Sequence, residues 1–376
     1  MKPGAVGGFP GALHGGDLPS SPAILVIRRD NIGDLVLTTP MFESLRRRFP
    51  GSYLAALVNS YNSAVLDGNP NLDDVFVYTK RKHLEGVSLT RSLFDRLSLF
   101  WRLRLRKFDY VILARNGFAG RALRTARWLA PRHIIGFLDD SCPASAAIDL
   151  PVEHAHAGTL HAAEDVHRLL APLGIEGSVP RATLIADPAR VAALRAAMPS
   201  SVSQGDGPLV AMHLSSRKEK QRWPAQNFVA LARRLRSEHS ARFLLFWSPG
   251  DDSNPHHPGD DAKAGAVLAD LADVPVAPVA TSDLAGLAAG LSLADHAILS
   301  DGGAMHVAAA LGKPLVCFFG NSSAAQWHPW DVPYQLLQKE SRDVADISVD
   351  ETAAAYRSLL QRIRAGADSL RAAPSP

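Results

Sequence analysis

A short polar segment, Ser300–Gly303, interrupts a long apolar stretch, and His306 follows it three residues later. The apolar run before the segment, 296–300, predicts a buried strand, and residues 304–312 predict a helix. Glycines permit a tight turn and a close approach of the backbone. The start of the helix offers free N–H groups and the positive end of the helix dipole. This combination suits a bound phosphate.

The two side chains around these glycines allow two interpretations. Asp301 can orient a ligand hydroxyl, and His306 leans back toward the helix start, where it could add a donor. Alternatively, the segment is a plain strand-turn-helix corner, with Asp301 as the helix cap and His306 in the core. The segment is not the G-x-G-x-x-G dinucleotide fingerprint, and the chain holds no G-x-x-x-x-G-K-[ST] loop.

Strands and helices that alternate along the chain must position this segment. Apolar runs with helical patterns between them imply right-handed crossovers and parallel sheets. Pro40 lies inside one helical pattern, which predicts a kink or a helix start near Thr39. The strands are expected at 23–29, 53–58, 73–78, 110–115, 133–137, 208–214, 242–247, 296–300 and 314–320.

The alternation of predicted strands and helices along the chain indicates two α/β halves. A less regular segment, 138–158, and a helix near 160–170 precede a seam at about 175–205, after which the alternation restarts. A length of 376 residues also favours two domains. Ligands of open α/β sheets bind beyond the carboxyl ends of the strands, so two such domains facing each other would hold a substrate in a cleft.

Composition limits the protein class. The chain is 47% hydrophobic and 20% charged, as in folded proteins, and its net charge of +3 is too small to indicate a nucleic-acid partner. Residues 1–20 are rich in Gly and Pro, lack the apolar core of a signal peptide, and are expected to be a flexible tail. No window is apolar enough to cross a bilayer. We therefore expect a cytoplasmic protein whose membrane contact, if it has one, is peripheral.

The two cysteines carry no sign of a site. Cys142 and Cys317 are far apart and share no metal-ligand spacing, and Cys317 lies in an apolar run. A buried structural thiol at Cys317 and a reducing cytosol are expected.

Three segments together resemble glycosyltransferase family 9, the ADP-heptose:lipopolysaccharide heptosyltransferases. "SDGGAMHVAAALGKPLVCFFG" resembles the family's carboxyl-terminal motif, and "ILVIRRDNIGDLVLTTPMFESLRRRFPGS" resembles its Gly-Asp signature. "HLSSRKEKQRWPAQNFVALARRL" resembles its phosphate loop, which precedes Trp-Pro and a helix. Each motif alone is only suggestive, whereas three in the right order are specific.

The resemblance implies a GT-B fold, an α/β architecture of two Rossmann-like domains with parallel sheets facing a central cleft. The expected parts are a tail at 1–20, an acceptor domain at 21–180, a nucleotide-sugar domain at 181–345, and a terminal helix and tail at 346–376. The implied reaction is metal-independent, inverting transfer of a heptose or a related sugar. The donor would be an ADP-sugar, ADP-heptose in the family, without a further cofactor, and the acceptor a lipid-linked saccharide of the lipopolysaccharide inner core.

The resemblance assigns the catalytic base to Asp34, at the family's Gly-Asp position. Inverting transfer needs a base that takes a proton from the acceptor hydroxyl. A carboxylate at the start of a helix can do so, although the helix dipole lowers its basicity. Asp30 is a second candidate four residues earlier. The alternative is that Asp34 is an ordinary acid at a helix start.

The resemblance also implies a set of donor-binding residues. Hydroxyls, backbone N–H groups and cations would stabilise the leaving diphosphate. The family commonly has Lys two residues before the Trp; Gln221 stands there, so either neighbouring cation could contact phosphate, or the charges could simply be solvated. An acid after residues 242–247 would hold the ribose, either Asp251 or Asp252. The set is Ser215, Ser216, Lys220, Arg222, Asp251, Asp301, Gly302, Gly303 and His306.

Positive charge gathers in the first third of the chain, at Arg46–Arg48 and Trp101–Lys107. The latter segment suits a phosphate-bearing acceptor or a membrane surface, or it is a solvated helix face. His256 and His257 lie in a loop without metal-ligand spacing, so no metal is expected. Other possibilities are a family 9 transferase with another sugar or acceptor, a non-catalytic nucleotide-sugar binding protein, and a sugar-nucleotide epimerase of similar fold.

Overall fold

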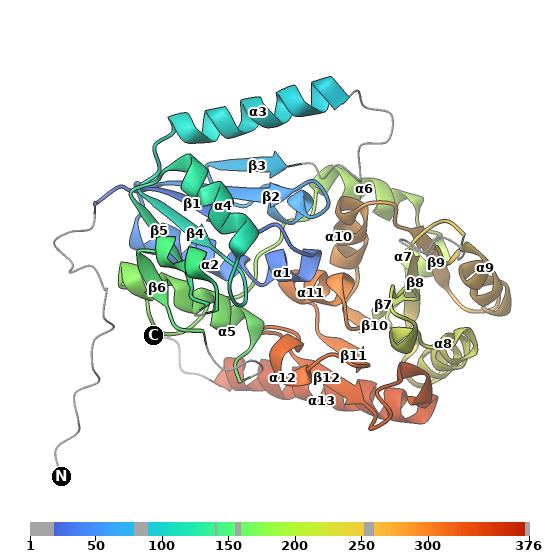
Figure 1. Ribbon diagram of the computed structural model, residues 1–376. Helices are drawn as coiled ribbons and strands as arrows, with labels where there is room; N and C mark the ends of the chain where they lie inside the picture. Colours follow the sequence, from blue (N-terminus) through green and yellow to red (C-terminus); the bar gives the residue numbers. More distant parts are fainter. Residues whose placement is uncertain (1–18, 79–88, 140, 155–158, 252–258, 373–376) are drawn as a thin grey trace, which may run out of the picture. The chain divides into compact units, whose positions relative to one another are not determined.

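The computed structural model describes residues 19–78, 89–139, 141–154, 159–251 and 259–372. Its internal contacts divide the chain into two compact units, with the boundary between Thr183 and Leu184 (Figure 1). We call them unit 1 and unit 2 and describe each by itself.

Unit 1 contains a six-stranded parallel sheet with the order β3-β2-β1-β4-β5-β6. This is the strand order of a doubly wound dinucleotide-binding fold. The apolar runs expected to be strands form its centre, because a parallel sheet covered on both faces buries every residue of a central strand. The strands are β1 (Ala23–Ile27), β2 (Tyr53–Asn59), β3 (Asp74–Tyr78), β4 (Tyr110–Leu113), β5 (His133–Phe137) and β6 (Leu150–Val152).

The helices of unit 1 follow the strands in sequence. Pro40 is the second residue of α2, a position that does not require its missing N–H, so the predicted helix start at Thr39 is confirmed. Leu103 of α3 packs with Phe76 and Val111 in the apolar core. The α-helices are α1 (Ile32–Val36), α2 (Thr39–Arg48), α3 (Leu89–Leu105), α4 (Gly120–Leu129) and α5 (Ala162–His167); the 3₁₀ helices are η1 (Ser63–Leu66), η3 (Pro143–Ala147) and η4 (Arg168–Leu173).

Unit 2 repeats the same topology with its own six-stranded parallel sheet. Its order, β12-β11-β10-β7-β8-β9, becomes the order of unit 1 when the strands are numbered from β7. The strands are β7 (Leu209–His213), β8 (Arg242–Trp247), β9 (Val276–Ala280), β10 (His296–Ser300), β11 (Leu315–Phe319) and β12 (Tyr334–Gln338). The predicted α/β class is therefore confirmed in both units.

The core of unit 2 forms around Trp223. Its ring packs against Phe228 and Phe318, with centroids 4.9 Å away in each case, and its Nε1 donates a 2.8 Å hydrogen bond to the Ile347 carbonyl. The α-helices are α6 (Pro188–Ala197), α7 (Ser200–Ser203), α8 (Ala225–His239), α9 (Asp261–Asp270), α10 (Leu284–Leu293), α11 (Gly303–Ala310), α12 (Ala324–Trp327) and α13 (Val349–Ala372); the 3₁₀ helices are η5 (Glu219–Gln221) and η6 (Val344–Asp346).

Three strands were not predicted from the sequence, and all three lie at sheet edges. β6 falls inside the segment expected to be irregular, and β9 and β12 were also missed. Pro151 and Pro278 interrupt the patterns of β6 and β9, and proline is tolerated at an edge because no ladder hydrogen bond is required there. Every residue of β12 is only partly buried, so its apolar signal is weak.

The structure also bears on the two cysteines and on membrane-spanning segments. Cys142 and Cys317 are both free thiols, and Cys317 is buried, as predicted. Burial raises the pKa of Cys317 well above its usual value. Among the described residues, no helix is both long and apolar enough to span a bilayer.

Candidate functional site

Most of the predicted site residues follow the strands at which the strand order of each sheet reverses. In unit 1 this point lies between β1 and β4, and in unit 2 between β7 and β10. The loops after these strands diverge to opposite faces of a doubly wound sheet and leave a crevice. Asp34 follows β1, Ser215 and Ser216 follow β7, and Asp301 follows β10.

Asp34 is held on both carboxylate oxygens. Its Oδ1 accepts a 2.6 Å hydrogen bond from Arg28 Nη2. Its Oδ2 accepts hydrogen bonds from the backbone N and from Nδ2 of Asn31, at 3.1 and 2.9 Å. A carboxylate has about four acceptor positions, so these three contacts leave one for a further donor. The bond to the Asn31 N–H caps α1, so Asp34 does act as an acid at a helix start.

The charge state of Asp34 follows from competing effects. Burial raises the pKa of Asp34, but the Arg28 guanidinium and the hydrogen bonds from Asn31 lower it, and the net pKa lies below its usual value. Asp34 is therefore ionised at neutral pH. Asp30, the second candidate, lies 3.5 Å from Arg28 Nε and 4.0 Å from Arg115 Nε.

A polar network that was not predicted extends from buried Arg28. Arg28 is 2% exposed and donates to the Ala114 carbonyl at 2.6 Å and to Asn116 Oδ1 at 3.2 Å. Asn116 Nδ2 in turn donates to Asp165 Oδ2 at 3.0 Å, and His154 Nε2 lies 3.1 Å from the same oxygen. These residues are far apart in the chain and share no spacing, so only the fold brings them together.

In unit 2, the loop after β7 folds back on itself. Ser215 Oγ accepts a 2.9 Å hydrogen bond from the Ser248 N–H, and the Ser216 carbonyl accepts one of 2.9 Å from Arg222 Nε. Arg222 is half-buried, whereas Lys220 is exposed. His213 Nδ1 lies 3.1 Å from the Ser215 carbonyl; burial lowers the pKa of His213 to about 4, so its ring is neutral and donates this bond.

Gln221 joins this loop to the turn after β10. It is 5% exposed, and its Nε2 donates to Asp301 Oδ2 at 2.9 Å and to Ser322 Oγ at 3.2 Å. Ser216 Oγ lies 3.4 Å from Gln221 Oε1. The residue that replaces the expected lysine is therefore a neutral bridge between the two loops of the crevice.

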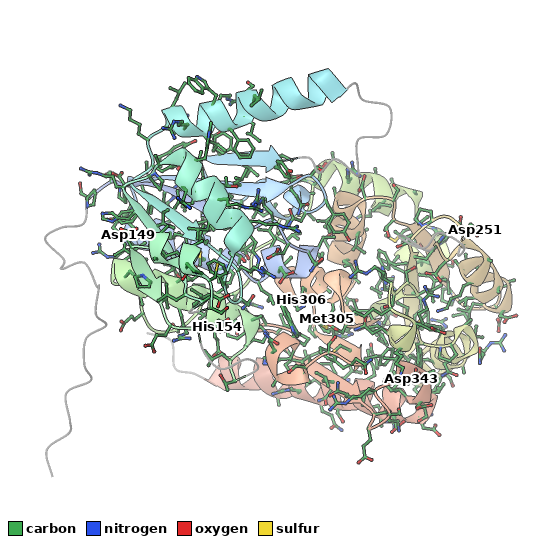
Figure 2. The ribbon with its side chains drawn as sticks, in the orientation of Figure 1. Asp149, His154, Asp251, Met305, His306 and Asp343 are labelled. Atoms are coloured by element: carbon green, nitrogen blue, oxygen red, sulfur yellow. The ribbon has the colours of Figure 1, made fainter. Side chains whose placement is uncertain are left out.

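The turn itself has the predicted helix-start geometry. Gly302 caps α11 with a φ of 153°, which favours glycine, and a Cβ at Gly302 would meet nothing within 4 Å. Glycine is thus required for backbone conformation, and the space beside it is open to a ligand. His306 is 3% exposed, and its ring lies 6.2 Å from the Trp327 ring in a T-shaped arrangement. Figure 2 shows His306 beside Met305 on α11.

Two further residues fix the loop and were not predicted. Lys263 Nζ donates to the Leu214 carbonyl at 3.2 Å and to the Trp223 carbonyl at 2.9 Å, so it ties together the two ends of the loop. A Cβ on Gly320 would lie 2.8 Å from the Lys220 carbonyl oxygen, which is too close. The "FG" at the end of β11 therefore lets the 219–221 turn pack directly on that strand.

Asp251 follows β8, whereas the other predicted donor residues follow β7 and β10. It is exposed after β8, and Figure 2 shows it in a different part of unit 2 from His306. Asp261 also acts at the end of β8, where it accepts hydrogen bonds from Trp247 Nε1 at 2.7 Å and from the Gly250 N–H at 2.9 Å. Asp252, His256 and His257 lie outside the described residues. Within the described part of the chain, no group of three or more His, Cys, Asp or Glu side chains is placed to hold a metal ion.

Comparison with known proteins agrees with this architecture. The chain is 22% identical over 315 residues to lipopolysaccharide heptosyltransferase 3 of Escherichia coli, which covers 79% of this chain and 83% of that protein. A family 9 glycosyltransferase structure from Veillonella parvula matches with a TM-score of 0.71 and 20% identity, over 91% of this chain and 97% of that one. The E. coli heptosyltransferase WaaC with ADP matches with a TM-score of 0.70 and 17% identity, over 90% and 99%.

The family model for glycosyltransferase family 9 (heptosyltransferase) matches residues 96–354, more than two thirds of the 376 residues. This range contains all the predicted donor-binding residues, whereas Asp34 lies before it. The chain belongs to glycosyltransferase family 9.

Proposed function

We propose that this protein transfers a heptose from ADP-heptose to a lipopolysaccharide inner-core acceptor, with inversion at the anomeric carbon and without a metal ion. The observation that carries the proposal is the pair of loops at the β7/β10 crevice, joined through Gln221 and Asp301 and open above Gly302. Two structures of one relative support the choice of donor: E. coli WaaC was solved with ADP and with ADP-2-deoxy-2-fluoro heptose.

Unit 2 would bind the donor diphosphate. The N-terminus of α11, at Gly302 and Gly303, offers backbone N–H groups and the positive end of the helix dipole. Ser215 and Ser216 would add donors from the loop after β7. Such preorganised donors stabilise the negative charge that develops on the departing diphosphate.

Arg222 is the cation that we assign to the diphosphate. Its Nε is fixed on the Ser216 carbonyl, so its two terminal nitrogens remain next to the serines that would contact phosphate. A planar guanidinium held in this way binds phosphate with little further loss of freedom. Lys220 has the same charge, but its side chain is exposed to solvent. Ordering it on a phosphate would therefore cost more conformational entropy than ordering Arg222.

Asp34 would act as the base in unit 1. The acceptor hydroxyl would donate its hydrogen bond to the remaining acceptor position of the Asp34 carboxylate. As the hydroxyl oxygen forms its bond to the anomeric carbon, the proton passes to Asp34, and the bond between that carbon and the diphosphate breaks. ADP then leaves with the electron pair.

A lipid-linked acceptor would bring the enzyme to the cytoplasmic face of the inner membrane. The saccharide of such an acceptor is polar and projects from the bilayer, so a protein can reach it from the aqueous side. Peripheral contact with the membrane is therefore part of the proposal.

The test is release of ADP from ADP-heptose, measured with and without a truncated lipopolysaccharide acceptor. We expect acceptor-dependent release in the wild type and a loss of about 10²- to 10⁴-fold in Asp34→Asn, the range typical of a general base. ADP binding, measured by thermal shift, should remain because the donor residues lie in unit 2. Asp30→Asn is the matched control and should retain most of the transfer rate.

Other outcomes identify the alternatives. Release that depends on another nucleotide sugar would keep the family and change the donor. Binding of ADP-heptose without turnover on any acceptor would indicate a binding protein, an interpretation that the neutral Gln221 favours. Near-full activity in Asp34→Asn would remove the proposed base.

A further inference from the structure

The outer face of α3 carries large apolar side chains that the described residues of unit 1 leave exposed. Leu97, Trp101 and Leu105 are 59%, 60% and 65% exposed. They are spaced four residues apart, so they span only about 80° of the helix circumference. We call these three residues the α3 stripe. A contiguous exposed row of this kind on a folded protein marks an interaction surface.

The opposite face of α3 accounts for the packing of the helix. Leu103 is fully buried in the apolar core, and Leu99 and Phe100 pack against it. Figure 1 shows α3 lying over the sheet edge at β3, as a layer of its own. The stripe is therefore not needed to attach the helix, and its apolar character requires another explanation.

Basic side chains flank the stripe on both sides. In a regular helix Arg104 lies next to Leu97 on one side, and Arg102 lies beyond Leu105 on the other. Arg104 stacks on Trp128 at 5.5 Å and donates a hydrogen bond to its carbonyl, and Arg102 lies 5.9 Å from the Phe76 ring. These contacts hold both guanidinium groups beside the apolar row.

A shallow pocket continues the basic surface at the end of the helix. It has a volume of about 290 Å³ and is lined by Phe76, Arg102, Leu105 and Arg106. Asp74 lies 3.6 Å from Arg106 and neutralises part of its charge. Lys107, just past the helix, is exposed.

We propose that the α3 stripe and its flanking basic residues dock the protein on the surface of an anionic phospholipid bilayer. A helix with an apolar row of Leu and Trp between cationic side chains lies in the plane of a membrane interface, with the row among the acyl chains and the cations on the headgroups. A second copy of the chain fits less well, because it would bring arginines against arginines. This inference rests on the proposed function only in that a lipid-linked acceptor gives the docking a purpose.

The experiment is flotation of the full chain with vesicles. We expect binding to vesicles that contain phosphatidylglycerol and little binding to pure phosphatidylcholine. Raised salt should weaken the binding, since exposed charges are screened. Trp101 fluorescence should be quenched by brominated acyl chains, and the quenched fraction should be lost in Trp101→Ser.

Two double variants separate the apolar and the basic contributions. The apolar variant, Trp101→Ser with Leu105→Ser, removes most of the α3 stripe. The basic variant, Arg102→Gln with Lys107→Asn, removes two positive charges. Asparagine is chosen at position 107 because it tolerates the positive φ of 50° that Lys107 has. Each should weaken vesicle binding roughly 10- to 30-fold. The matched control is Ile185→Ser with Arg195→Gln, which removes an exposed apolar and an exposed basic residue from unit 2 and should bind as the wild type does.

Three results would overturn the docking surface. They are equal binding to neutral and anionic vesicles, unchanged binding in both α3 variants, and a change of oligomeric state in these variants without a change in vesicle binding. A loss of transfer to a soluble, delipidated acceptor would instead assign the arginines to the acceptor. Vesicle binding needs no substrate, so it can hold when no transfer is found, and transfer to the soluble acceptor can persist when docking fails.

Discussion

At the scale of the residue, Asp34 combines two demands that oppose each other. A base should bind a proton well, yet Arg28 and Asn31 stabilise the charged carboxylate and lower its pKa. The same contacts fix the direction of the carboxylate and keep it ionised over the whole physiological range. Arg28 thus fixes the orientation of the Asp34 carboxylate and at the same time lowers its basicity.

Arg28→Gln should therefore shift the pH profile of transfer. Without the guanidinium, burial is the dominant effect on Asp34, so its pKa rises and a larger fraction is protonated at low pH. We expect the acid limb of kcat/KM to move to higher pH, by about one unit or more. The measurement is the pH dependence of ADP release.

Arg28→Lys is the control for that shift. It keeps the positive charge but loses the forked contact to Asp34 and the Ala114 carbonyl. The acid limb should stay near its wild-type position while the rate falls. An acid limb that moves equally in both variants would contradict an electrostatic role for Arg28.

The choice between Arg222 and Lys220 is a second question at this scale. A charge-assisted hydrogen bond to phosphate contributes about 1.5–3 kcal/mol, so Arg222→Gln should weaken ADP binding about 10- to 100-fold. Lys220→Gln should weaken it only a few-fold, because an exposed lysine is screened by solvent. Isothermal titration with ADP measures both, and the reverse ranking would reassign the contact to Lys220.

Sequence alone identified residues whose chemistry shows in their type and position. The glycines of the β10 turn and the serines after β7 stand within three residues of the end of an apolar run that proved to be a strand. Asp34 lies seven residues after β1 and was assigned by the resemblance. Gln221, Asn116 and Lys263 gave no such signal, because each acts through a partner far away in the chain. Asp251 follows a different strand from the other donor candidates, and its role stays a prediction.

At the scale of the element, the end of β11 supports the short helix η5. Gly320→Ala would place a Cβ 2.8 Å from the Lys220 carbonyl oxygen and 3.3 Å from that of Arg342. Both are backbone atoms, so one of the segments must shift. We expect a loss of about 1–3 kcal/mol in the free energy of unfolding. ADP binding should weaken as well, because η5 carries Gln221.

Gly265→Ala is the matched control for that substitution. Gly265 lies inside α9, and a Cβ there meets nothing within 4 Å. The same change should stabilise unit 2 by about 0.5–1 kcal/mol, since alanine favours a helix, and leave ADP binding unchanged. Urea denaturation compares the two variants, and a stable Gly320→Ala with normal ADP binding would contradict the packing argument.

The three strands that were missed all lie at sheet edges, although one edge strand, β3, was predicted. Central strands are buried on both faces, so they form continuous apolar runs such as those of β1, β7 and β11. An edge strand has only one neighbour and tolerates proline and polar residues, as β9 and β12 do. The central part of each sheet could thus be predicted from the sequence, whereas its full width could not.

At the scale of the whole molecule, the two units have the same strand order and place polar loops at the same point of it. The alternation of patterns predicted two α/β halves, because period and length are visible in the sequence. The order of strands within a sheet is not visible in the sequence, since it depends on the direction in which each crossover connection moves along the sheet. The resemblance to a family implied Rossmann-like domains, and the structure gives the order of their strands.

Both units also bury histidines, and this links the stability of the molecule to pH. His167 of unit 1 lies 2.8 Å from Ser44 Oγ, and His296 of unit 2 lies 3.0 Å from the Tyr356 hydroxyl. Burial lowers the pKa of both, and it lowers that of His213 to about 4. In the unfolded chain these histidines regain a pKa near 6.5 and bind protons that the folded protein does not.

The free energy of unfolding should therefore fall as pH drops from about 7 toward 4. Each histidine that is protonated only in the unfolded chain contributes a slope of up to about 1.4 kcal/mol per pH unit. Carboxylates with a lowered pKa, such as Glu351 at about 2, lose their stabilising effect only below pH 4.5, so the two effects occupy separate ranges. We expect the free energy of unfolding, measured by urea denaturation between pH 7 and 5, to fall less steeply with decreasing pH in His167→Gln and in His296→Gln than in the wild type. A slope unchanged in both variants would mean that other groups govern the acid sensitivity of the two units.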